Sequence, residues 1–232
     1  MNFLVIDSSG DRSAVGVWTD AGAWGEGTTA VSRKHGCDLV PLIRDLLREA
    51  ELEAVDLTDV AVGLGPGSYT GLRIGLTAAR MLAYTAGAKL LGFDSLEGFA
   101  QNAPDDAVNV QVIADAQRGD VYCASFERAE AGGVLRAVAP SRIEPIGRWA
   151  ADLEPGALVL GPGLNSGAIR AALPDRVVVA EPDLNQPSGR RLVELARRIA
   201  ASGVEFDFWG LEPNYIRRSA AEDQWAARAG RR

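Results

Sequence analysis

The segment 63–76, "GLGPGSYTGLRIGL", is rich in glycine, as are the loops that bind phosphate through backbone N–H groups. A P-loop has the pattern GxxxxGK[ST], because its lysine reaches the terminal phosphates, whereas Leu72 and Arg73 follow Gly71 here. A dinucleotide-binding loop has the pattern GxGxxG, but Thr70 stands where its third glycine belongs. The segment therefore matches neither kind of phosphate-binding loop.

Two acidic residues stand at comparable places in the two halves of the chain. Asp7 and Asp115 each end an apolar run and begin a polar turn, "DSSGDR" and "DAQRGD". Two such carboxylates are available to a cleft that handles phosphate and magnesium, and Ser8 with the residues after it could form a weak anion nest. The simpler interpretation of both turns is local turn and cap chemistry. An active small-molecule kinase stays open as an alternative, although no other polar cluster supports it.

Histidine and cysteine are too scarce for a metal site. His35 is the single histidine, and the two cysteines, Cys37 and Cys123, stand in unrelated contexts. A His-based metal site needs several converging ligands, and a peptidase needs a metal or a nucleophile–base pair. We therefore predict no metal site, and the peptidase interpretation is disfavoured. Because neither phosphate-binding loop pattern is present, we also predict no cofactor.

The composition is that of a globular protein. Of 232 residues, 47% are hydrophobic and 24% are charged, and the formal net charge is -7. A protein that binds nucleic acid by itself usually has a basic surface patch, and a net charge of -7 does not indicate one. The first apolar run ends at Asp7 and is too short to be the apolar core of a signal peptide. No run reaches the ~18 apolar residues of a membrane span. We expect a cytoplasmic protein that needs no membrane.

The elements that position these residues follow one order in both halves: three strands, a helix, a strand, a helix and a strand. A Gly-Pro-Gly turn, at 65–67 and again at 161–163, follows a buried-strand pattern each time. This recurrence predicts a duplicated α/β fold, with a boundary at "APDD" that gives a first lobe, 1–106, and a second lobe with a C-terminal tail, 107–232. The end of that tail, "SAAEDQWAARAGRR", is expected to fray.

The helix expected over 70–87 has an unusual stripe of small residues. Gly71 and Gly75 stand four apart, and each glycine inside a helix costs about 0.5–1 kcal/mol relative to alanine. Close packing would offset this cost, either against the chain's own sheet or against another chain. A neighbouring stripe mixes aromatic, leucine and arginine side chains, which is the composition of a protein interface; it comprises Tyr69, Leu72, Arg73, Leu76 and Arg80.

The same segment resembles the "GPGSFTGLRIG" signature of the TsaB family, also called YeaZ. Further matches come in the family's order: "LVIDSS", "SRKHGCDLVPLI", "FDSLEGFA", "DAQRGDVYCASF" and "EPNYIRR". The resemblance covers residues 3–217, nearly the whole chain. It implies the two-lobe fold of the actin-like ATPases, sugar kinases and heat-shock chaperones (ASKHA), with a mixed five-stranded sheet and helices in each lobe.

The resemblance also implies a function. TsaB proteins are non-catalytic scaffolds of the bacterial complex that moves a threonylcarbamoyl group from an adenylate onto adenosine next to the anticodon of tRNAs reading codons that begin with A. The transfer site and the metal-binding histidines belong to the paralogue TsaD, and an ATPase, TsaE, assists. In this chain Leu39 stands where a second histidine would follow His35, so no catalytic or metal-binding residue is carried over.

The family resemblance places the partner contact on the helices of the first lobe. These helices would pair with TsaD, or with a second copy of the chain when TsaD is absent, and tRNA would be met only through the complex. We therefore predict an interface made by Tyr69, Leu72, Arg73, Leu76 and Arg80, with Leu39 and Ile43 beside them. Asp7, Ser8 and Asp115 are expected to form vestigial turns that face the place of a nucleotide phosphate.

Overall fold

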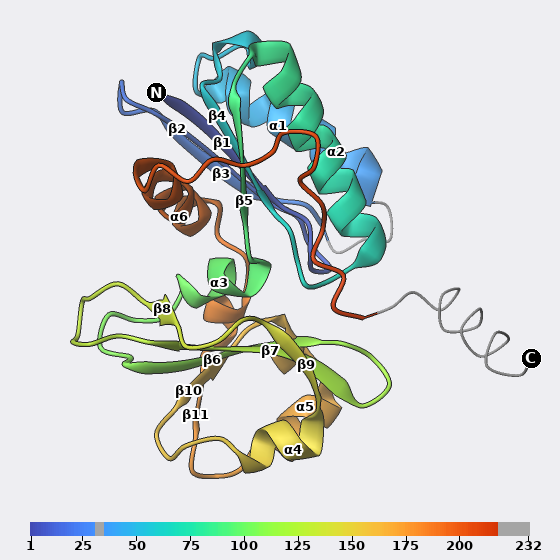
Figure 1. Cartoon of the computed structure of the whole chain (residues 1–232), viewed down its shortest axis with the longest axis vertical. Coiled ribbons are helices and arrows are strands. Elements are labelled where there is room, and N and C mark those ends of the chain that lie inside the picture. The colour runs from blue at the N-terminus through green and yellow to red at the C-terminus, as the bar shows by residue number, and fades with distance from the viewer. Residues whose placement is uncertain (31–34, 218–232) are drawn as a thin grey trace, which may run out of the picture.

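The computed structural model describes residues 1–30 and 35–217, although not the side chains of residues 35 and 36, so the predicted tail end and the His35 side chain lie outside the description. The chain forms two lobes, one above the other in Figure 1. The first lobe is built on a sheet with the order β3-β2-β1-β4-β5. Its strands are β1 (Asn2–Asp7), β2 (Ala14–Thr19), β3 (Trp24–Thr28), β4 (Asp59–Gly63) and β5 (Lys89–Phe93). The first three pair antiparallel, and β1, β4 and β5 run parallel.

Helices cover both faces of this sheet (Figure 1). Alternate residues of β1 point to opposite faces, as a strand requires: Leu4 and Ile6 pack with α1 (His35–Glu49) and α2 (Tyr69–Ala86), while Phe3 and Val5 pack on the other side. The short helices η1 (Ala54–Asp56) and α3 (Ser95–Ala100) complete the first half of the chain. No helix within the described residues is long and apolar enough to cross a bilayer.

The last helix, α6 (Gly189–Ala201), lies on the first lobe although it comes from the second half of the chain. Its residues Leu192, Val193 and Leu195 share a core cluster with Phe3 and Val5 of β1. The contact with β2 is so close that a Cβ on Gly189 would lie 2.2 Å from the carbonyl oxygen of Val15. The predicted division at 106/107 is therefore wrong for this helix, which belongs to the first lobe.

The second lobe repeats the topology of the first. Its sheet has the order β11-β10-β6-β7-β8, with β9 also paired to β7. The elements are β6 (Asn109–Asp115), β7 (Asp120–Glu127), β8 (Arg136–Ala137), β9 (Arg142–Pro145), α4 (Ile146–Ala151), β10 (Leu158–Leu160), η2 (Pro162–Asn165), α5 (Gly167–Ala172), β11 (Val178–Val179) and η3 (Pro182–Asn185). Read from β8 to β11, this order matches that of the first sheet, so the predicted two-lobe, actin-like fold is confirmed.

The second sheet differs from the prediction in one detail, because it has six strands instead of five. The single third strand expected over 132–144 is divided into β8 and β9. Pro140 lies between them. Proline has no N–H to donate to a strand ladder, so the pairing with β7 breaks there and resumes at Arg142.

The glycine stripe of α2 packs against the chain's own β1–β2 turn. The helix begins after Ser68, whose Oγ accepts a hydrogen bond from the Gly71 N–H at 3.2 Å. Side-chain atoms at Gly71 and Gly75 would lie 2.1 Å from the carbonyl oxygen and the Oγ of Ser8, respectively. The Ser8 hydroxyl donates to the Gly71 carbonyl at 2.7 Å. Of the two predicted packing partners, the chain itself is therefore the one observed.

We expect Gly71→Ala to destabilise the protein, although alanine is the better helix former. The added Cβ meets the fixed carbonyl of Ser8, and such overpacking typically costs about 1–3 kcal/mol. Gly147→Ala in α4 is the matched control, because no atom lies within 4 Å of its Cβ position. Urea denaturation should show a clear loss of stability for the first variant and, because alanine is the better helix former, a gain of up to about 1 kcal/mol for the second. Equal stability of Gly71→Ala and the unmodified chain would contradict this packing.

Candidate functional site

A cleft of about 420 Å³ lies between the two lobes. From the first lobe it is lined by the β1–β2 turn at Ser9 and by the segment that leads into α2, including Tyr69. From the second lobe it is lined by the β6–β7 turn at Asp115 and by Tyr122. This is the place where the fold could hold a phosphate-bearing ligand.

Asp7 does not face this cleft. Its side chain is buried, and Oδ1 accepts hydrogen bonds from the Ser9 N–H at 2.8 Å and the Ser9 hydroxyl at 2.6 Å. Oδ2 lies so close to β4 that a Cβ on Gly63 would come within 2.1 Å of it, and Ser95 Oγ is the polar atom nearby. Burial raises the pKa of the Asp7 carboxyl, and the interactions with Ser9 and with the Ser95 side chain oppose that rise. Ser8 is likewise buried, beneath α2.

Asp115, in contrast, is exposed and lines the cleft. Its Oδ1 accepts a hydrogen bond from the Gln117 N–H at 2.7 Å, which is turn chemistry. Of the three residues expected to face a phosphate, Asp115 reaches the cleft, whereas Asp7 and Ser8 are covered. The first turn lines the cleft through Ser9, Gly10 and Asp11 instead. Among the described residues, no group of three or more histidine, cysteine or acidic side chains is placed to hold a metal ion.

The cationic side chain in the cleft, Arg217, is already engaged by the chain. Its Nη2 forms an ion pair with Asp120 at 2.5 Å and donates to the Gln117 carbonyl at 3.3 Å. These interactions of Arg217 link the end of the described chain to the second lobe. Within the described residues, the cleft therefore presents two exposed carboxylates, Asp11 and Asp115, and one arginine that is already paired.

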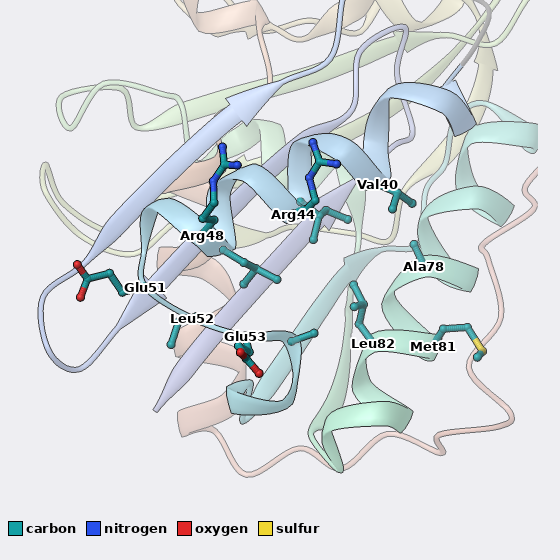
Figure 2. Close-up of a pocket in the computed structure, with 12 residues that line it drawn as sticks. Val40, Arg44, Arg48, Glu51, Leu52, Glu53, Ala78, Met81 and Leu82 are labelled. Carbon is teal, nitrogen blue, oxygen red and sulfur yellow. The ribbon is translucent and has the colours of Figure 1, made fainter.

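A second and larger hollow lies on the outer side of the first lobe, between α1 and α2 (Figure 2). We call it the docking groove. Its volume is about 720 Å³. Its apolar lining comprises Val40, Ile43, Leu47, Leu52, Ala54, Ala78, Met81 and Leu82, and its charged lining comprises Arg44, Arg48, Glu51 and Glu53.

The docking groove exists because both helices direct their larger apolar side chains at the sheet. Leu39 and Leu46 of α1 are buried in the core, and so are Leu76 and Ala83 of α2. Small side chains such as Ala78 stand between the helices and leave the space open. Val40 is 60% exposed and Met81 is 57% exposed, so the groove carries apolar surface that the chain itself does not cover.

The interface prediction is wrong for four of its seven residues, because these four are buried in the first lobe and not on its surface. Leu39, Ile43, Leu72 and Leu76 are each at most 5% exposed. Leu72 and Leu76 fall on the α2 stripe that continues through Ala79 and Ala83, and this stripe faces the sheet. Ile43 reaches only the floor of the docking groove.

The other three predicted residues contact the chain's own C-terminal strap, by which we mean residues 207–217. The strap runs beside α2, as Figure 1 shows in red. Tyr69 stacks on Tyr215 with ring centroids 4.9 Å apart, and the Arg73 Nε donates to the Tyr215 hydroxyl at 3.0 Å. Arg80 donates to the Leu211 carbonyl. This side of α2 is therefore already used within the chain.

The sequence prediction missed the residues that the structure leaves open, above all Val40, Met81 and Tyr84. Met81 and Tyr84 stand three apart, so they are neighbours on one face of α2, and both are largely exposed. A helical projection of α2 contains this signal, because the two large side chains fall outside the stripe of leucine and alanine.

Comparison with known proteins relates the chain to tRNA modification. A family model described as "TsaD: tRNA N6-adenosine threonylcarbamoyltransferase" matches residues 29–225. The "tRNA threonylcarbamoyladenosine biosynthesis protein TsaB" of Bacillus subtilis is 28% identical over 97% of this chain and 98% of its own length. The protein of the same name from Escherichia coli is 27% identical over 95% of this chain and 96% of its own length.

A solved structure agrees with these matches. It is a Pseudomonas aeruginosa protein described as uncharacterized and similar to peptidase YeaZ, and it superimposes with a TM-score of 0.80 at 25% identity. The superposition covers 93% of this chain and 99% of that one. In the present chain Cys37 is exposed and Cys123 is buried.

The buried Asp7 predicts a specific pH dependence of stability. An acid whose pKa is raised by folding binds its proton more tightly in the folded state, so the free energy of unfolding falls as pH rises through that folded pKa. Asp7→Asn retains an acceptor for Ser9 and removes the charge. The free energy of unfolding of this variant, relative to that of the unmodified chain, should therefore increase with pH. The increase is about 1.4 kcal/mol for each tenfold difference in the proton affinity of Asp7 between the folded and unfolded states. Urea denaturation between pH 4.5 and 7.5 measures this, and parallel curves would contradict it.

Proposed function

The chain belongs to the family that the TsaD model describes, and within it to TsaB (YeaZ), and on this premise we propose that it is a non-catalytic subunit in the biosynthesis of threonylcarbamoyladenosine in tRNA. It would support the catalytic paralogue TsaD together with the ATPase TsaE, in the cytoplasm. Its contact with tRNA would come through the complex, consistent with a net charge of -7.

The chemistry of the interlobe cleft supports a non-catalytic role. Transfer of a group to or from a nucleotide needs stabilised phosphate charge and a positioned acid or base. The Asp7 carboxyl is buried against Gly63 of β4 and Ser95 of α3, and Arg217 is paired with Asp120. Asp115 remains exposed and is occupied with its own turn. The alternative of an active small-molecule kinase gains no support from this arrangement.

The docking groove is the observation that supports a scaffold role. It is an apolar hollow of about 720 Å³ between two helices, with Val40 and Met81 more than half exposed at its edges. An apolar surface of this kind on a helix pair is typical of sites that receive another protein. We propose that the first-lobe helices of TsaD cover it, or those of a second copy when TsaD is absent. A stable contact of this kind buries over ~1,000 Å² in total.

Reconstitution tests the function directly. Purified TsaD and TsaE, supplied with the threonylcarbamoyl adenylate and tRNA, should modify tRNA only when this chain is present. The chain alone should produce no modified adenosine, because the one arginine that lines its cleft within the described residues is already paired with Asp120. Turnover by the isolated chain, or full activity without it, would overturn the proposed role.

A charge placed in the docking groove should break the complex. Val40→Glu would put a carboxylate against the partner's apolar surface, where an unpaired charge is strongly disfavoured. We expect the dissociation constant for TsaD to rise at least ~30-fold, which corresponds to about 2 kcal/mol. Isothermal titration calorimetry measures this change.

The matched control is Val178→Glu, the same substitution at a similarly exposed valine on β11 of the second lobe. It should leave TsaD binding unchanged. Both variants should keep the native far-ultraviolet circular dichroism, because both side chains are exposed. Leu76→Glu is unsuitable as a test, since its side chain is in the core and the variant should unfold. Equal binding by Val40→Glu and Val178→Glu would exclude the docking groove as the contact.

A further inference from the structure

The C-terminal strap holds a tryptophan outward beside α2. Trp209 is 68% exposed, although a side chain of this size and apolarity is usually well covered in a folded protein. Its ring lies 5.8 Å from that of Tyr84 and 5.0 Å from that of Phe208, measured between centroids. Tyr84 is itself 63% exposed. The three rings thus form an aromatic cluster on the surface of α2, near its C-terminal end.

This aromatic cluster is continuous with the docking groove. Met81 lines the groove, and Tyr84 follows three residues later on the same helix, which makes the two side chains neighbours on the α2 surface. Tyr84 then contacts Trp209 of the strap. Apolar and aromatic surface therefore extends from Val40 on α1, across α2, to the strap. The α2 face between them remains uncovered by the described chain.

The strap is fixed firmly enough to hold Trp209 in this position. The Asn214 N–H donates to the Leu64 carbonyl at 2.7 Å, and Leu211 packs so closely over β5 that a Cβ on Gly92 would lie 3.1 Å from its Cδ1. The Trp209 N–H donates to Asp207 Oδ1 at 3.1 Å, and the Leu211 N–H donates to the Asp207 carbonyl at 2.9 Å. A partner that binds here would therefore not have to order the backbone first.

We propose that Trp209, together with Tyr84, is part of the partner-binding surface, and that the helix that enters the docking groove also covers this aromatic cluster. The inference rests on the proposed function and names a further contact of the same complex. The partner is the TsaD paralogue, which would meet the cluster with an apolar helical face. Tryptophan and tyrosine dominate binding where they become fully desolvated, and both rings here have most of their surface available.

Two substitutions at Trp209 test the proposal in the full chain. Trp209→Ala removes the ring, and we expect the dissociation constant for TsaD to rise about 10- to 100-fold. Trp209→Phe retains an aromatic ring and should recover part of this loss. The matched control is Trp24→Ala, because Trp24 is also exposed, at 39%, and lies on β3 of the same lobe, where it stacks with Arg190 instead of α2. This control should bind as the unmodified chain does.

A spectroscopic measurement adds a readout at the residue itself. With 5-fluorotryptophan incorporated into the chain, the fluorine signal of Trp209, assigned by its absence in Trp209→Phe, should shift when TsaD is added. The signal of Trp24 should stay in place. Thermal unfolding of each variant confirms that the fold is intact, which we expect because both rings are exposed.

The outcomes separate this inference from the proposed function. If Val40→Glu abolishes binding while Trp209→Ala binds normally and its signal does not move, the docking groove stands and the contribution of the strap is overturned. If neither variant weakens binding, both proposals are overturned. Equal weakening by Trp209→Ala and Trp24→Ala would also overturn the inference, because the effect would then not be specific to the strap.

Discussion

The close contact between α2 and the β1–β2 turn determines how the first lobe is arranged. Gly71 and Gly75 let the helix approach until Ser8 touches its backbone, and Gly67 lets the preceding segment lie against the carbonyl of Ser9. A side chain at any of these three positions would meet an atom at 2.3 Å or less. Glycine weakens a helix, so the stability lost within α2 must be recovered from this packing. The contact fixes both the depth and the rotation of α2 on its sheet.

A different packing encloses Asp7. It alternates with Phe3 and Val5 along β1, so its side chain points to the sheet face opposite α2, where it lies against Gly63 of β4 and Ser95 of α3. A carboxylate in such a place is costly to ionise and is not accessible to a ligand. The corresponding acid of the second lobe, Asp115, stays exposed. The two lobes thus share a topology and differ in what covers the equivalent acid.

The topology was predictable from the sequence, because it depends on local signals. Strand patterns ending in acids, Gly-Pro-Gly turns and the Ser68 cap each specify an element and its limits. The placement of α6 was not predictable, since an amphipathic pattern shows that a helix packs on something without showing which sheet. The rotation of α2 was also undecided, because leucines occur on one stripe and Met81 with Tyr84 on another. The position of the strap was not predictable either, because its sequence has no hydrophobic periodicity that would indicate a contact with Arg73 and Arg80.

The surroundings of α2 explain why an apolar surface stays exposed on the first lobe. One side of the helix faces the sheet through Leu76 and Ala83, a second faces α1 across the docking groove, and a third is held by the strap through Arg73 and Arg80. The remaining side carries Met81 and Tyr84. The sheet and the strap hold the helix on two of these sides, so it cannot rotate to cover Met81 and Tyr84, and their apolar surface stays exposed.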